Sequence, residues 1–283
     1  MAATQNRDMG SGSIPKLLAQ LALPAVVAQV VNLLYNIVDR IYIGHMPEVG
    51  ASALTGVGLF TPILMLITAF AMLCGSGGAP RAAIAMGRGD DDAAEKIMGN
   101  CFTLLLILAA VLTVVFYFAA PSLLVLFGAS EKTLPYALDY ARIYIIGTIF
   151  VLIVMGMNPF VTTQGFATFS MMTTVIGAVC NIILDPILIF GLFGAPRLGV
   201  AGAAVATVTG QCVAAVAALI MNLKCNPDIH IVPRKIRFHG PTVKNIYRIG
   251  FPSIVMQCIG SVMVFGVNRI LISFTTTATA VFG

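Results

Sequence analysis

Seven apolar runs dominate this sequence, and each is long enough to cross about 30 Å of hydrocarbon as a helix. Hydrophobic residues make up 59% of the chain and charged residues only 10%, whereas an average soluble domain is about 25% charged. A soluble core cannot bury this much apolar surface, but a bilayer can. The sequence therefore predicts an all-α polytopic membrane protein, with spans near Ile14–Gly44, Ala51–Ala79, Cys101–Phe118, Leu134–Asn158, Ser170–Phe193, Gly199–Leu223 and Ile249–Phe274.

The basic residues predict how these spans are oriented. If the N-terminus is cytoplasmic, the outer loops contain only Lys132 and Arg197, and most other lysines and arginines fall in the inner segments. Positive residues concentrate on the cytoplasmic side of membrane proteins. We therefore expect a multi-pass protein with a cytoplasmic N-terminus. The polar stretch 1–13 has no signal-peptide pattern, so we expect the first span to be retained.

A polar stripe runs along the first span. Its members recur at steps of three and four, which places them on one face of a helix: Gln29, Asn32, Asn36 and Asp39. A carboxylate within a membrane segment costs roughly 2.5–3.5 kcal/mol on insertion scales, so it usually faces the interior of the bundle and has a function there. Pro24 lies upstream in the same span, where it should kink the helix.

A second polar group lies in the fifth and sixth spans. Asn181 and Asp185 are four residues apart, and so are Thr207 and Gln211. Asp185 and Asp39 both fall in the outer half of the membrane when counted along their helices, so they can face one cavity. Carboxylate, amide and hydroxyl oxygens suit Na⁺ or a carried proton rather than a soft transition metal. We expect no cofactor, and no metal other than a possible Na⁺.

Two plainer interpretations stand beside these. The polar residues could be static hydrogen-bonding contacts between helices, although a charge is a poor choice for that role in lipid. The stretch Gly87–Asp92, with its three consecutive aspartates, could hold a metal, but it reads more simply as a solvated turn before a helix, whose N-terminus favours acidic residues.

The seventh span repeats part of the first. Pro252 and Gln257 can be laid over Pro24 and Gln29, and internal duplication is common among transporters. The chain ends where the first copy enters its second helix, so we expect a fragment that does not transport alone. The expected domains are a six-helix lobe at 1–223, a cytoplasmic linker at 224–248 and the first helix of an incomplete C-terminal lobe at 249–283.

Three stretches resemble the multidrug and toxic compound extrusion (MATE) family, and most closely its MepA-like bacterial branch. They are Leu21–Pro24, Asp39–Gly44 and, most specifically, Asn181–Gly191. The resemblance implies twelve helices in two six-helix lobes, of which this chain would hold the N-terminal lobe and the start of the second. It also implies a secondary antiporter in the bacterial inner membrane that exports organic-cation drugs in exchange for H⁺ or Na⁺.

The resemblance also implies roles for individual residues. Asp39, Asn181 and Asp185 match the cation site of the N-terminal lobe, Thr207 is the best match for its hydroxyl, and Pro24 matches the proline where the first helix is thought to bend. The expected partners are small organic cations, the lipid bilayer and the missing C-terminal lobe, with no nucleic acid. We expect the substrate cavity to be lined by Gln29, Asn32, Asn36, Asn158 and Gln211.

Three alternatives belong to other classes. A flippase for a lipid-linked precursor should line its cavity with arginine or lysine, but the basic residues within these spans lie near their outer ends. A seven-helix receptor is disfavoured by the cytoplasmic N-terminus and by the absence of lysine from the seventh span. An enzyme is disfavoured because neither G-x-S-x-G nor H-E-x-x-H occurs.

Overall fold

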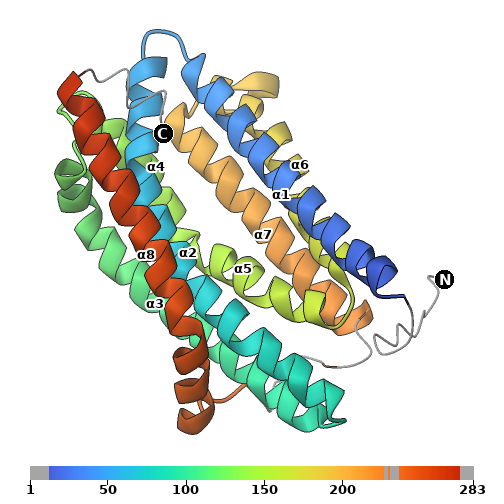
Figure 1. Ribbon diagram of the computed structural model, residues 1–283. Coiled ribbons are helices and arrows are strands. Elements are labelled where there is room, and N and C mark those ends of the chain that lie inside the picture. The colour runs from blue at the N-terminus through green and yellow to red at the C-terminus, as the bar shows by residue number, and fades with distance from the viewer. Residues whose placement is uncertain (1–12, 226–228, 230–235, 275–283) are drawn as a thin grey trace.

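The computed structural model describes residues 13–225, 229 and 236–274, and the secondary structure in these residues is helical (Figure 1). Six helices are long and apolar enough to cross a membrane, and the bent pair α4 and α5 makes a seventh span if it is counted as one. This confirms the predicted all-α membrane class. The elements are α1 (Ile14–Gly44), α2 (Gly50–Gly87), α3 (Asp91–Leu126), α4 (Leu134–Ile146), α5 (Thr148–Thr163), α6 (Ala167–Phe190), the short 3₁₀ helix η1 (Leu192–Gly194), α7 (Val200–Cys225) and α8 (Gly240–Phe274).

The connection between the second and third spans is much shorter than the sequence predicted. α2 continues through Pro80 to Gly87, because a membrane helix tolerates an internal proline where its neighbours satisfy the freed backbone groups. The side chain of Asp90 caps α3 by accepting a hydrogen bond from the Ala93 amide at 3.0 Å. The turn interpretation of Gly87–Asp92 is therefore correct. No group of three His, Cys, Asp or Glu side chains in the described part of the chain could hold a metal ion.

The fourth span is not the continuous helix that was predicted for Leu134–Asn158. It breaks at Gly147, and α4 and α5 meet there at an angle of 56°. The predicted span is retained when α4 and α5 are counted as one, but the break was not predicted, because a lone glycine in an apolar run does not by itself end a helix.

The helices form two groups on either side of α2. Figure 1 shows α1, α6 and α7 side by side in one group, while α8 lies along α2 in the other. Glycines allow α2 and α8 to cross closely, since a Cβ added at Gly77 would lie 3.1 Å from the amide nitrogen of Gly250. The hydroxyl groups of Ser76 and Ser253 are 2.7 Å apart beside this crossing.

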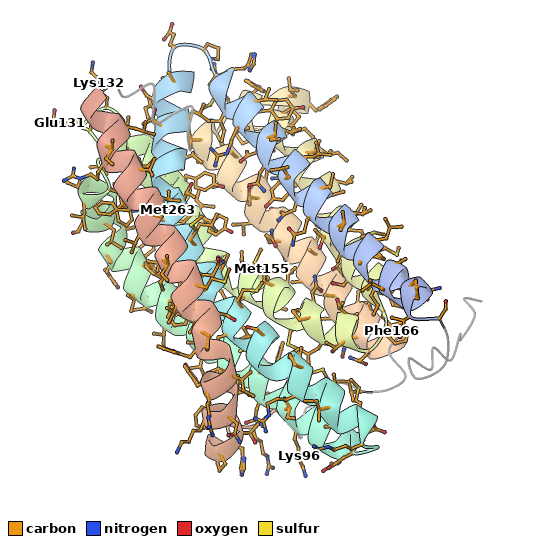
Figure 2. All side chains as sticks on the ribbon, in the orientation of Figure 1. Lys96, Glu131, Lys132, Met155, Phe166 and Met263 are labelled. Atoms are coloured by element: carbon orange, nitrogen blue, oxygen red, sulfur yellow. The ribbon has the colours of Figure 1, made fainter. Side chains whose placement is uncertain are left out.

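The two ends of the bundle carry different loops. Figure 2 places Lys96, in the first turns of α3, at the end opposite to Glu131 and Lys132, which precede α4. Successive spans therefore run in opposite directions. α8 begins at Gly240, within the predicted linker 224–248, and linker residues 226–228 and 230–235 lie outside the described residues.

Candidate functional site

The carboxyl groups of Asp39 and Asp185 come together where α1 packs against α6. Asp39 is 6% exposed and Asp185 is fully buried. The two groups are near enough to interact electrostatically, and Arg40 also acts on Asp39. The structure thus brings together the two carboxyl groups that the sequence placed in one site.

Asn181 connects α6 to α7 at the centre of this site. Its side-chain amide donates a hydrogen bond to Asp185 Oδ1 at 3.3 Å and another to Thr207 Oγ1 at 3.2 Å. The helices approach closely here because glycines face each other: a Cβ added at Gly177 would lie 3.0 Å from the carbonyl oxygen of Gly210. All four residues that the sequence predicted for ion binding therefore lie in one buried cluster.

Three oxygens in this cluster accept no hydrogen bond from the described part of the chain. They are Asp39 Oδ1, Asn181 Oδ1 and Asp185 Oδ2, and all three are buried. A buried oxygen without a donor is unfavourable by about 1–3 kcal/mol, and more if it is charged. A proton on one carboxyl group, or a small hard cation between the oxygens, would relieve that cost. The residues present therefore fit H⁺ or Na⁺.

Three tyrosines around the cluster were missed by the sequence analysis. Tyr140 lies within electrostatic range of Asp39, and its ring stacks on Tyr144 at 6.0 Å between ring centroids. Tyr35 lies within electrostatic range of both carboxyl groups. The signal was present in the spacing, because Tyr140 and Tyr144 share a helical face and Tyr35 lies one turn before Asp39.

The predicted ion-binding residues Asp39, Asn181, Asp185 and Thr207 are called the ion cluster below. A cavity of about 440 Å³ adjoins it and is walled by α1, α2, α5, α6 and α7. Gln29, Asn32, Asn158 and Gln211 line it, as the sequence predicted. Met155, near the middle of the bundle in Figure 2, adds an apolar wall. The described lining residues include no acidic or basic side chain, so the cavity combines amides and hydroxyls with apolar surface.

The cavity and the ion cluster share residues. Tyr35, Asn181 and Thr207 line the cavity and also belong to the cluster, whereas the two aspartates lie behind them. Asn158 is held in place by Thr173, whose hydroxyl accepts a hydrogen bond from the Asn158 amide at 3.1 Å. A molecule in the cavity would therefore touch the groups that hold the carboxylates.

Two predicted residues lie apart from this cavity. The Asn36 amide donates to the carbonyl of Asn32 at 2.7 Å, and Asn36 lines a neighbouring pocket with Arg40 that shares Gln29 and Asn32 with the main cavity. Pro24 lies inside α1, which is helical from Ile14 to Gly44, so its role as a hinge stays a prediction.

Comparison with known proteins decides the family. The MatE family model matches residues 24–187, a range that contains Asp39, Asn181 and Asp185. The chain belongs to the MatE family. Its curated relatives include multidrug export protein MepA from Staphylococcus haemolyticus, which is 26% identical over 271 residues. That match covers 96% of this MatE chain and 59% of MepA, so the chain spans well under two thirds of its relative's length.

Solved MATE structures share the fold. The multidrug transporter DinF-BH, solved in complex with a ligand, is 33% identical to this chain and matches it with a TM-score of 0.90. That match covers 99% of this chain and 62% of DinF-BH. An outward-facing MATE transporter of the MOP superfamily matches with a TM-score of 0.84 and 28% identity, covering 100% of this chain and 61% of that one. The chain is therefore related to MepA-like efflux transporters in both sequence and fold.

Proposed function

We propose that this chain forms the ion-coupling part of a secondary antiporter, which exports organic cations in exchange for H⁺ or Na⁺. The observation that carries the proposal is the cluster of three buried oxygens without donors, placed directly behind a cavity wall. Single buried oxygens without a partner also occur elsewhere in the described residues, at Thr148 and Gln164, so it is the grouping of three that favours ion binding over static contacts between helices. The MatE relatives are longer than this chain, and transport by a whole protein requires the part of their length that this chain does not cover.

The shared residues suggest how ion and cargo are coupled. An ion between Asp39 and Asp185 neutralises their mutual repulsion and draws α1 toward α6. Asn181 and Thr207 then move with the carboxylates and reshape the cavity wall that they line. A bend of α1 at Pro24 would change the same wall from its other side.

The cavity favours drug-like cargo over an anionic lipid. Its described lining combines neutral polar groups with apolar surface, which suits an amphipathic organic molecule. The relatives agree with this, since DinF-BH is named a multidrug transporter and MepA a multidrug export protein. A flippase for a diphosphate lipid needs basic groups in its cavity, and none lines the described part of this one.

The proposed location is the bacterial inner membrane with the N-terminus in the cytoplasm. Figure 2 places Lys96 and Lys132 at opposite ends of the bundle. Arg88 follows the end of α2 just before α3 and Lys96, and Arg40 and Arg269 lie near the ends of α1 and α8. The proposed orientation leaves only two basic residues in the outer loops, which agrees with the positive-inside rule.

The test is gradient-driven transport by a chimera of residues 1–223 with the C-terminal part of S. haemolyticus MepA. The probe is ethidium, a fluorescent organic cation. In vesicles, an imposed H⁺ or Na⁺ gradient should drive ethidium transport, and Asp39→Asn or Asp185→Asn should each abolish it. Asp139→Asn, at an exposed acid on α4, is the matched control and should transport like the parent. Transport at the parental rate by either of the first two variants would show the coupling role to be wrong.

A further inference from the structure

The fourth span bends by 56° at Gly147 although no proline lies at the break. Sharp bends arise at prolines, at glycine or serine pairs, at π-bulges, or where a side chain enters the ladder of backbone hydrogen bonds. Here that side chain is Thr113 of α3, whose Oγ1 donates to the carbonyl of Ile145 at 3.2 Å. In a straight helix the same carbonyl would accept from the amide of Ile149, four residues on.

In the bent span, the hydroxyl of Thr148 is left without a hydrogen-bond partner among the described residues. Thr148 is 0% exposed. In a straight helix a threonine hydroxyl can reach the carbonyl four residues back, here that of Tyr144. The bent form keeps the bond from Thr113, while a straight form would satisfy Ile145 and Thr148 within the span.

The break lies between the ion cluster and the cavity wall. The backbone of Gly147 packs against the side chain of Val208, since an added Cβ would lie 3.1 Å from Val208 Cβ. Val208 follows Thr207, whose hydroxyl accepts a hydrogen bond from Asn181 of the ion cluster. Beyond the break, α5 carries Asn158 into the cavity. A change in the angle at Gly147 would therefore move the cavity wall relative to the ion cluster.

We infer that Thr113 is a positioning residue that holds the fourth span bent, and that straightening at Gly147 links the ion cluster to the cavity wall. The inference rests on the proposed function. It makes the fourth span a second moving element, in addition to the proposed bend of α1 at Pro24. Its driving contact lies on a third helix, α3, which contributes no residue to the described lining of the cavity.

A single tryptophan can test this, because the chain contains none. Phe150→Trp places the reporter just beyond the break, and the 283-residue chain is studied in lipid nanodiscs. Quenching of the reporter by brominated lipids is measured without ions for the parent, Thr113→Val and Thr113→Ser. Thr103→Val is the matched control, since Thr103 is on the same helix and its hydroxyl bonds the carbonyl of Gly99 in that helix.

Thr113→Val should change the quenching, while Thr113→Ser and Thr103→Val should match the parent. In titrations with Na⁺ and with acid, Thr113→Val should also shift the midpoint of the reporter's ion response by about fivefold, the size expected for the loss of one hydrogen bond. The inference would be overturned if quenching by brominated lipids in Thr113→Val equals that in the parent. It would also be overturned if Thr103→Val changes the quenching as much as Thr113→Val does. The proposed function fails separately, if Asp185→Asn leaves the ion response of the reporter intact.

Discussion

Replacing Asn181 by leucine should weaken ion binding more than any other change outside the two aspartates. The substitution removes one of the three unpartnered oxygens and also the donor of two hydrogen bonds, to Asp185 and to Thr207. A hydrogen bond to a charged group contributes about 1.5–3 kcal/mol, which corresponds to about 10- to 150-fold in the dissociation constant. We expect Na⁺ affinity to fall within that range.

The assay is equilibrium binding of radioactive Na⁺ to the purified chain in nanodiscs, with proton uptake followed in parallel by a pH indicator. Asn36→Leu is the matched control, because Asn36 bonds its own helix and does not line the main cavity. It should retain ion binding to within about threefold, since no contact of Asn36 with the ion oxygens is lost. If Asn181→Leu binds the ion like the parent, or if Asn36→Leu weakens binding equally, the reasoning from these contacts is refuted.

Three further predictions concern the surroundings of the site. Gly177→Leu should destabilise the chain by about 1–3 kcal/mol, because its side chain would be forced against Gly210, whereas Gly87→Leu should have little effect; thermal unfolding in detergent compares them. Gln211→Lys should weaken ethidium binding at least tenfold by placing a positive charge in the cavity, and Gln211→Ala should weaken it less, as measured by fluorescence polarisation. Asp90→Ala should cost about 1 kcal/mol by removing the cap of α3, which the unfolding midpoint would report.

Helical spacing predicted which polar side chains share a face, and the family resemblance grouped them into an ion cluster. Asn181 and Asp185 share a face because four residues make about one turn, and that is a local property. The apolar flanks then require such a face to point into protein rather than lipid. The two carboxyl groups were predicted to meet because they lie at similar depths, and the structure brings them together.

Contacts between distant segments explain what the sequence could not predict. Within the fourth span the break is marked only by Gly147, and Thr113, which bonds the Ile145 carbonyl there, lies on another helix. Asn36 belongs to the same stripe as Asn32, but the positions of the neighbouring helices leave it outside the main cavity. The tyrosines were passed over because their role depends on which polar groups lie across from them.

The central claim is that an ion held by Asp39 and Asp185 changes the cavity in front of it. The most direct measurement is ethidium binding to the chain at zero and at saturating Na⁺, repeated at low and high pH. Linkage requires that the ion change the ethidium dissociation constant by the same factor as ethidium changes that of the ion. We predict such a reciprocal change in the parent and its loss in Asp185→Asn. Ethidium affinity that is the same with and without either ion would contradict the account.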